Sequence, residues 1–336
     1  MQRRVLAILT IAALAAAAPE TVAATNIKPL SARPASAPAA DRWKAQAVAA
    51  IAKWEALDSQ SASSSVLNLS FIARAIAESN GWDDPRLPGL LARLMALRNP
   101  DGGWGVNQPF DAFSDGTVNP ASTSYTVTMT DHVGPLLLAA WQKGLLSDAE
   151  PLTTIGALLM RIPKWPVAGG HCVAYSTSVN DQKGAQQCVH NVNASLGLFL
   201  GQLADAGVPV SGASNLRMMI TRAEVASYDV RAKNWPYALT GRVNDPVHAA
   251  MNTEAMLRMA PDLANRPLVN LMQSTGNSPR DAIAHFRLGA FRCDMADRWL
   301  PEMQQFVYDA PSPALHNLAM AAFGAARLAI RCAAAS

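Results

Sequence analysis

From residue 41 onward, apolar residues recur along the chain with the three-to-four-residue spacing of helices that bury one face. The two-residue alternation of β-branched residues that marks strands is scarce. The helical pattern predicts about twelve helices, or six hairpins, in one all-α domain. Their expected ranges are 41–57, 63–79, 85–98, 121–144, 148–162, 187–206, 212–227, 245–260, 262–274, 279–291, 297–307 and 312–333.

The predicted helices alternate between two kinds. The first member of a pair is amphipathic, as in residues 44–57, whereas the second is rich in small residues and apolar nearly all round, as in residues 64–77 and 316–329. A helix without a continuous polar face is buried on both sides. We therefore expect an (α/α)6 toroid, with six inner helices inside six outer ones. A right-handed solenoid of helix pairs is the alternative.

Long connections lead into the predicted inner helices at residues 98–121, 162–187 and 227–245, whereas the return connections are short. Long loops on one face are typical of functional sites. They end at the N-termini of the inner helices, where the helix dipole favours anions and partly negative oxygens. The sequence therefore predicts a site at this mouth of the toroid.

The segment from Trp235 to Met256 has the clearest group of residues that could take part in catalysis. Asp245 is a favourable N-cap, and one turn into the helix that it starts, His248 and Asn252 share a face at a spacing of four residues. Five of the six histidines fall on predicted inner helices, several of them beside Asp, Asn or Tyr. Packed, hydrogen-bonded histidines are the alternative explanation.

An imidazole beside a carboxylate transfers protons near neutral pH, a tyrosine donates a proton, and amides hold hydroxyl or carboxylate groups. The candidate catalytic residues are His248, Asp245, His132, Asp131, Tyr125, Tyr237 and His190. The candidate substrate-binding residues are Trp235, Asn191, Asn193, Asn252 and Trp104.

The sequence lacks the motifs that are typical of several classes of function. The zinc patterns H-E-x-x-H and C-x-x-C, the phosphate-binding glycine loops and the G-x-S-x-G nucleophile turn do not occur. The net charge of +3 is dispersed, without the basic stripe of a nucleic-acid-binding protein. We therefore expect no cofactor, no metal and no nucleic-acid partner.

The N-terminus is predicted to be an export signal. Residues 1–24 have a basic start, an apolar stretch too short to span a bilayer comfortably, and a small-residue cleavage site near Ala24. Residues 25–40 are rich in Pro, Ala and Ser and predict a disordered linker before a single domain at 41–336. No later apolar run is long enough to span a membrane, so the protein is expected to be secreted or periplasmic.

Four cysteines follow the predicted cleavage point, and an even number in an oxidising compartment favours two disulfides. The four cysteines can form two disulfides in three different ways, and the sequence alone does not choose among them. We favour Cys172–Cys188, which closes a loop, and Cys293–Cys332, which ties the last helix to an earlier one.

Two segments resemble a known family. The turn Asp101-Gly-Gly-Trp-Gly105, followed by Ser122-Thr-Ser-Tyr-Thr126, is similar to the repeat of squalene–hopene cyclases and related α/α toroids. The segment Trp235-Pro-Tyr237 with Asp245 and His248 resembles another repeat of that superfamily. The resemblance implies a toroid and covers two hairpins. The acidic D-x-D-D motif of the cyclases and the zinc ligands of the prenyltransferases are missing.

These patterns favour an exported, cofactor-independent acid–base enzyme, a lyase, dehydratase or isomerase. Its substrate is expected to be a small molecule or a polysaccharide, with a carbohydrate or uronate and a terpenoid-like alcohol both open. One alternative is a glycoside hydrolase that uses Asp131 and Asp245, and another is a non-catalytic ligand-binding or scaffold toroid.

Overall fold

The computed structural model describes residues 37–59, 65–239, 244–273, 278–296, 300–303, 305, 307, 309 and 314–333. All of them belong to one compact unit, residues 32–336. The predicted signal peptide at 1–24 and most of the predicted linker at 25–40 lie outside the described residues. The first helix begins at Ala37, so the last four residues of the predicted linker are helical. Pro38 suits a first helical turn, where its missing N–H costs nothing.

The described part of the chain is mostly helical, which confirms the all-α class. Its longer helices are α1 (Ala37–Asp58), α2 (Val66–Asn80), α3 (Leu87–Ala96), α4 (Gly134–Gln142), α5 (Glu150–Arg161), α6 (His190–Asp205), α7 (Ala213–Ala226), α8 (Pro246–Met259), α9 (Pro261–Gln273), α10 (Pro279–Gly289) and α13 (Leu315–Ala333). Shorter helical elements are the π-helical turn η1 (Thr128–Val133), the 3-10 turns η2 (Val179–Asp181) and η3 (Ala185–Gln187), and α11 (Cys293–Ala296) and α12 (Leu300–Met303).

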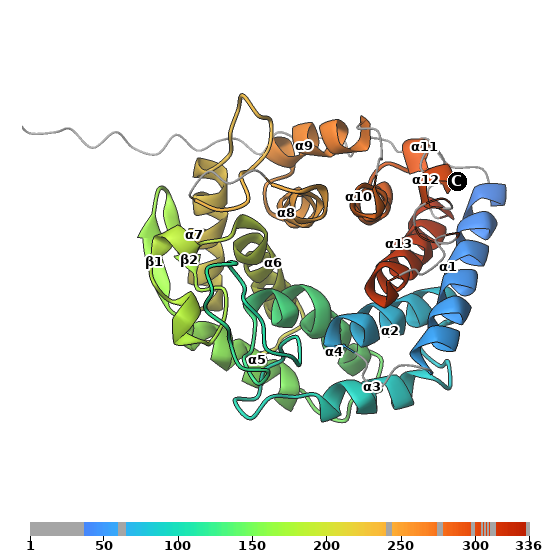
Figure 1. Ribbon diagram of the computed structural model, residues 1–336, viewed down its shortest axis with the longest axis horizontal. Helices are drawn as coiled ribbons and strands as arrows, with labels where there is room; N and C mark the ends of the chain where they lie inside the picture. The colour runs from blue at the N-terminus through green and yellow to red at the C-terminus, as the bar shows by residue number, and fades with distance from the viewer. Residues whose placement is uncertain are drawn as a thin grey trace, which may run out of the picture. The chain divides into compact units, whose positions relative to one another are not determined.

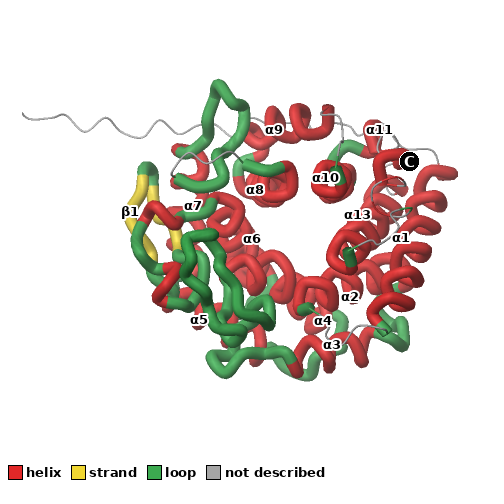
Figure 2. The backbone as a smooth tube through the Cα atoms, in the orientation of Figure 1, coloured by secondary structure: helices red, strands yellow, loops and turns green. Residues whose placement is uncertain are grey.

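One set of helices packs in a closed circuit. Helix α2 contacts η1, which contacts α6, and the contacts continue through α8, α10 and α13 back to α2. Figure 1 shows these helices around a common centre, and the tube in Figure 2 shows the same arrangement. They are the segments that the sequence predicts as the buried members of the pairs.

The remaining long helices pack outside this circuit. Helix α1 contacts both α13 and α2, α3 contacts α2, α5 contacts α4, α7 contacts α6, and α9 contacts α8 and α10. The outer helix α1 buries Trp43 and Trp54, and Trp43 packs edge-on against Phe286 of the circuit helix α10, at 5.2 Å between ring centroids. Their burial supplies much of the hydrophobic driving force for packing one set on the other. Among the described residues, no helix has the length and apolar character needed to cross a membrane.

A two-stranded antiparallel sheet, absent from the sequence prediction, lies in the predicted loop at 162–187. Strand β1 (Lys164–Val167) pairs with β2 (Gly170–Val173), and β2 packs against α7. The disulfide Cys172–Cys188 joins β2 to the residue two places before α6. The second disulfide, Cys293–Cys332, joins α11 to α13. Both predicted pairings are confirmed.

The turn at residues 99–105 is held by its own polar groups. The Asp101 carboxylate accepts hydrogen bonds from the Gly103 amide at 2.9 Å and the Ser124 hydroxyl at 2.7 Å. Trp104 is fully buried, and its indole N–H donates to the Leu94 carbonyl at 2.9 Å. Gly105 lies so close to residue 123 that a Cβ would stand 2.0 Å from the Thr123 carbonyl oxygen. The turn therefore anchors the chain before η1.

We predict that Gly105→Ala lowers the free energy of unfolding by about 1–3 kcal/mol, because the added methyl group overlaps backbone that cannot move freely. Gly89→Ala is the matched control. No atom lies within 4 Å of a Cβ built at Gly89, which lies inside α3, so alanine should raise stability by about 0.5–1 kcal/mol. Urea denaturation of both variants measures the difference, and equal stabilities would contradict the close approach at Gly105.

Candidate functional site

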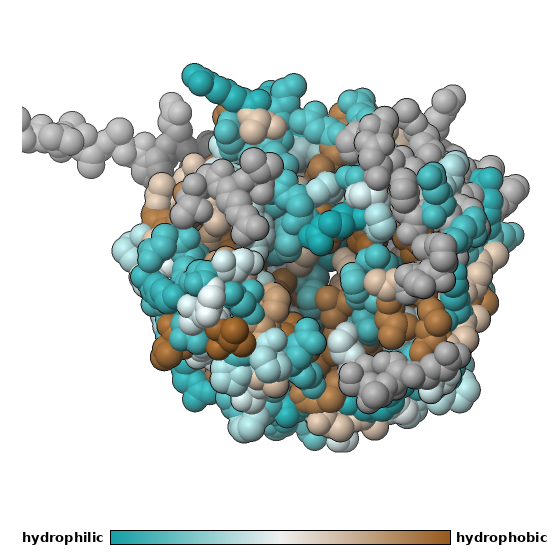
Figure 3. Space-filling view, viewed as in Figure 1, coloured by the Kyte–Doolittle hydropathy of each residue, from teal (hydrophilic) through white to brown (hydrophobic). Residues whose placement is uncertain are grey.

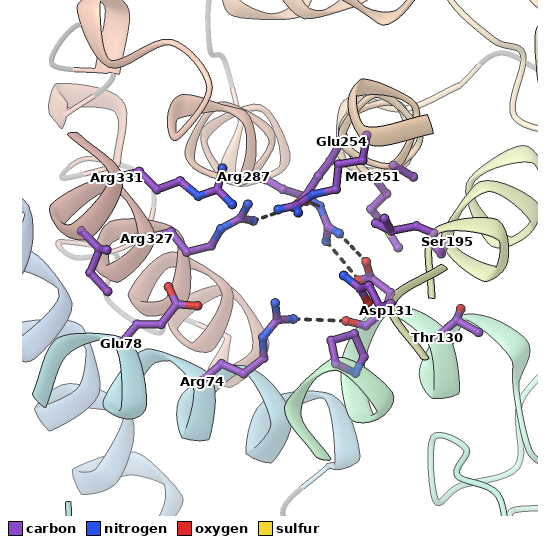
Figure 4. Close-up of a pocket in the computed structure, with 16 residues that line it drawn as sticks. Arg74, Glu78, Thr130, Asp131, Ser195, Met251, Glu254, Arg287, Arg327 and Arg331 are labelled. Atoms are coloured by element: carbon purple, nitrogen blue, oxygen red, sulfur yellow. Dashed lines mark hydrogen bonds and ion pairs between the residues drawn. The ribbon is translucent and has the colours of Figure 1, made fainter. Parts of the chain in front are cut away.

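A cavity of about 300 Å³ lies among the helices of the closed circuit and receives side chains from every one of them. Its charged lining consists of five arginines and three acids: Arg74, Arg258, Arg287, Arg327, Arg331, Glu78, Asp131 and Glu254. Figure 4 labels all of these side chains except Arg258 and shows the labelled ones directed toward one another across the cavity. On the face visible in Figure 3, hydrophilic residues gather beside a hollow near the centre.

Regular helical spacing positions most of these charges. Arg74 and Glu78 are four residues apart on α2, as are Glu254 and Arg258 on α8 and Arg327 and Arg331 on α13. Residues at this spacing share one face of a helix. Each of these three helices therefore places two charged groups on the side that faces the cavity.

Four of the charged side chains form a buried network that joins η1, α8, α10 and α13. Glu254 bridges Arg287, at 2.6 Å from its Nε, and Arg327, at 2.7 Å from its Nη1. Arg287 also forms a bidentate ion pair with Asp131. Each of the four side chains is less than a tenth exposed. Charges buried so deeply persist because each one has a partner of opposite sign.

The network fixes both of its carboxylates in the ionised form. Burial by itself raises the pKa of Glu254, but the charges of Arg327 and Arg287 outweigh burial and hold it at about 2. Burial likewise opposes ionisation of Asp131, and Arg287 and His132 hold its pKa below the usual value. Neither acid is therefore ready to exchange protons near neutral pH.

The Arg74 side chain is hydrogen-bonded to a backbone carbonyl in the cavity wall, that of Asp131. Pro135 has no N–H to give to the Asp131 carbonyl, four residues earlier, where the π-helical turn passes into α4. The Arg74 guanidinium donates to this oxygen at 3.2 Å and lies 3.9 Å from the centroid of the Phe323 ring. Burial lowers the pKa of Arg74 to about 10, so the group remains a cation at neutral pH.

The cavity has a surplus of positive charge. Five guanidinium groups against three carboxylates leave two more cations than anions. Within the described part of the chain, Arg74, Arg258, Arg331 and Glu78 form no ion pair with any other group. Unpaired guanidinium groups in a partly enclosed site are suited to bind carboxylate or phosphate oxygens.

His132 lies next to the cavity rather than in its wall. Its Nε2 is 3.4 Å from an Asp131 oxygen, and its ring packs against Phe71 at 5.3 Å between centroids. Burial lowers the pKa of His132 to about 4, so the imidazole is neutral at physiological pH. Of the candidate catalytic residues, only Asp131 lines the cavity, and His132 contacts it.

His190 belongs to a second, separate network that ties α6 to α7 and α8. Its Nδ1 is 3.1 Å from the Glu224 carboxylate, which also accepts from Asn193 at 2.9 Å and from Asn252 at 3.5 Å. All of these side chains are buried. Asn191 contacts the Met251 sulfur at 3.8 Å. These four candidates hold helices together.

His248 and Asp245 lie at the N-terminus of α8, as the sequence predicts. Asp245 caps the helix through the amides of Val247 and His248, and its second oxygen is hydrogen-bonded to Nδ1 of His248. Tyr237 packs edge-on against this imidazole, at 4.9 Å between ring centroids. Burial opposes ionisation of Asp245, but the bonds to His248 and then Arg280 hold its pKa well below the usual range.

The other candidates are parts of the scaffold. The Tyr125 hydroxyl accepts from Asn119 at 3.2 Å, and burial raises its pKa, which keeps the phenol protonated. Trp235 is fully buried and donates to the Glu224 carbonyl at 2.8 Å, and Trp104 anchors its turn. The candidate residues therefore fall into separate networks and do not meet in one cavity.

Sequence reasoning missed seven of the eight charged residues of the cavity and found only Asp131. The signal that identifies six of them is the pair of charges four residues apart on one helix, as at Arg74 and Glu78, whereas Arg287 has no such partner. No described group of three or more His, Cys, Asp or Glu residues could hold a metal ion.

No protein-family model matches the chain, and no curated protein is significantly similar to it.

We predict that the free energy of unfolding falls as the pH is lowered from about 6.5 to about 4. His132 is neutral in the folded protein down to about pH 4 but takes up a proton below about 6.5 once unfolded. The unfolded state then binds more protons, and stability declines by up to about 1.4 kcal/mol per pH unit. Glu254, with a folded pKa of about 2 against 4.5, extends the decline to lower pH.

Urea denaturation at several pH values tests this, with His132→Gln compared with His171→Gln. The first variant should lose the decline between pH 6.5 and 4, and the second should keep it. A decline that is the same in both variants would contradict the assignment to His132.

Proposed function

We propose that this chain is an (α/α)6 toroid and a cofactor-independent acid–base enzyme, a lyase or isomerase, that acts on a small carboxylate-bearing substrate such as a sugar acid. The observation that carries the proposal is the surplus of two positive charges in the cavity, with Arg74, Arg258 and Arg331 outside its ion pairs. The circuit of helix contacts, with the outer helices packed around it, supports the toroid. The two disulfides fit an exported protein.

The lining favours a polar ligand over a terpenoid-like alcohol. Apart from Pro135, Leu198, Met251, Ala255 and Ile330, every residue that lines the cavity is charged or polar. Gln202 also lines the cavity, and a side-chain amide can hydrogen-bond to a ligand hydroxyl. A volume of about 300 Å³ is at the small end of ligand pockets, which suits a single sugar ring.

A carboxylate held by guanidinium groups also prepares a substrate for proton abstraction. Removing a proton from the carbon next to a carboxylate places more negative charge on the carboxylate oxygens. Fixed cations beside those oxygens stabilise the developing charge more than the ground state. The chemistry that this arrangement supports is therefore elimination or epimerisation next to a carboxylate, and it requires no cofactor.

The glycoside hydrolase has less support. Its two acids, Asp131 and Asp245, belong to separate networks, and each has a lowered pKa. A glycosidase needs one carboxyl group with a raised pKa to protonate the leaving oxygen. A non-catalytic binding protein would have the same anion-binding site as the proposed enzyme. Only a measurement of turnover distinguishes the two.

Calorimetric titration with galacturonate, glucuronate and galactose tests the binding site. The unmodified protein should bind the acids at least tenfold more tightly than the neutral sugar. Arg74→Gln should weaken binding of the acid roughly tenfold to hundredfold, because one charge-assisted hydrogen bond is lost. Arg161→Gln, an exposed position at the end of α5, is the control and should bind as the unmodified protein does.

Turnover is followed by NMR, as exchange of the hydrogen next to the carboxylate with solvent deuterium, and by absorbance of a new conjugated double bond. Equal affinity for acids and galactose would contradict the proposal. Binding of acids without exchange or elimination would favour the non-catalytic alternative.

A further inference from the structure

Resting on the proposed function, we infer that Glu78 is the catalytic base: its carboxylate takes the proton from the carbon next to the substrate carboxylate that the cavity arginines bind. Sequence reasoning did not single out this residue.

The position of Glu78 fits this role. It lies one helical turn after Arg74 on α2, and both side chains line the cavity. Figure 4 shows the Glu78 carboxyl group at the edge of the cavity, with Arg74 to its right and Arg327 above it. A base on the same helix face as the carboxylate-binding group can reach the carbon attached to that carboxylate.

Glu78 is also the one cavity acid, among the described residues, whose oxygens are not engaged by an arginine. Asp131 and Glu254 are held in ion pairs by Arg287 and Arg327. Their lone pairs are directed at guanidinium groups and are not available to a substrate proton. Within the described part of the chain, Glu78 has neither a hydrogen bond nor an ion pair.

The electrostatic surroundings support the assignment. Burial is the largest influence on Glu78 and raises its pKa above 4.5. The facing charges of Arg74, Arg327 and Arg331 act in the opposite direction without cancelling that effect, and Glu254 adds to it. A carboxylate with a raised pKa is a stronger base than an exposed one, and the pKa comes closer to neutral pH, where general bases work best.

The proposed step balances as follows. A Glu78 oxygen forms a bond to the proton while the C–H bond breaks. The electron pair of the C–H bond moves into the substrate carboxylate, which becomes an enolate beside Arg74. In elimination, that pair forms a carbon–carbon double bond while the bond to the oxygen on the next carbon breaks. The leaving oxygen takes a proton from water. In epimerisation, water on the opposite face gives a proton to the same carbon instead. In both reactions the hydroxide that water leaves takes the proton from Glu78, which restores the carboxylate.

Glu78→Gln separates this role from a structural one. The amide keeps the shape of the side chain but accepts no proton, so exchange of the hydrogen next to the carboxylate should fall at least about 100-fold. The affinity for galacturonate should stay the same or rise, because a negative charge leaves a cavity that binds an anion. Asp205→Asn, an exposed acid at the end of α6, is the control and should change neither quantity.

The pH dependence gives a second readout. Exchange by the unmodified protein should increase with pH as Glu78 loses its proton, and the residual exchange of Glu78→Gln should lack that step. Exchange within a few-fold of the unmodified rate in a folded Glu78→Gln protein would overturn the assignment and leave the proposed function standing. Binding without exchange in the unmodified protein would overturn both the catalytic role and the enzyme, and leave only an anion-binding site.

Discussion

The ion-pair network of Asp131, Arg287, Glu254 and Arg327 is the constraint on which the centre of this molecule depends. A charge removed from water is costly unless another charge and hydrogen bonds compensate it. The four side chains compensate one another and, in doing so, set the distances between η1, α8, α10 and α13. The same network determines which charges remain available. It engages two of the three acids of the cavity and leaves Arg74 and Glu78 facing the open space.

The polar groups of the circuit helices have two different tasks. In the first turns, Asp245 caps α8, while His190 is paired with Glu224 and so joins α6 to α7. Farther along the helices, the polar groups face the cavity, as Glu254 and Arg327 do. Because the imidazoles and amides lie mainly in the first turns, they do not come together in one cavity. Each satisfies a local need for hydrogen bonds where two helices and a loop come together.

The sequence predicted the all-α class and most of the helices because apolar residues recur at helical spacing, which the order of residues displays directly. Most helices appear within a few residues of their expected bounds, and both disulfides pair as expected. The helix predicted at 121–144 starts later, with η1 at Thr128, and the one predicted at 297–307 is described only as α12, Leu300–Met303. Strands β1 and β2 were missed because each has only four residues and is held by pairing with the other, while α7 and the disulfide at Cys172 hold β2. The cavity was missed because Arg331 resembles an ordinary basic residue in a last helical turn, and nothing in the sequence shows which way Arg327, one turn earlier, is directed. Only the packing of six helices shows that such residues face a common interior.

The most direct measurement is a crystal structure of the Glu78→Gln protein grown with galacturonate. The account predicts the sugar carboxylate in the central cavity, within hydrogen-bonding distance of the Arg74 guanidinium, with the adjacent C–H directed at residue 78. A sugar bound instead beside Asp245 and His248, or a cavity closed by its own arginines with no ligand inside, would contradict it.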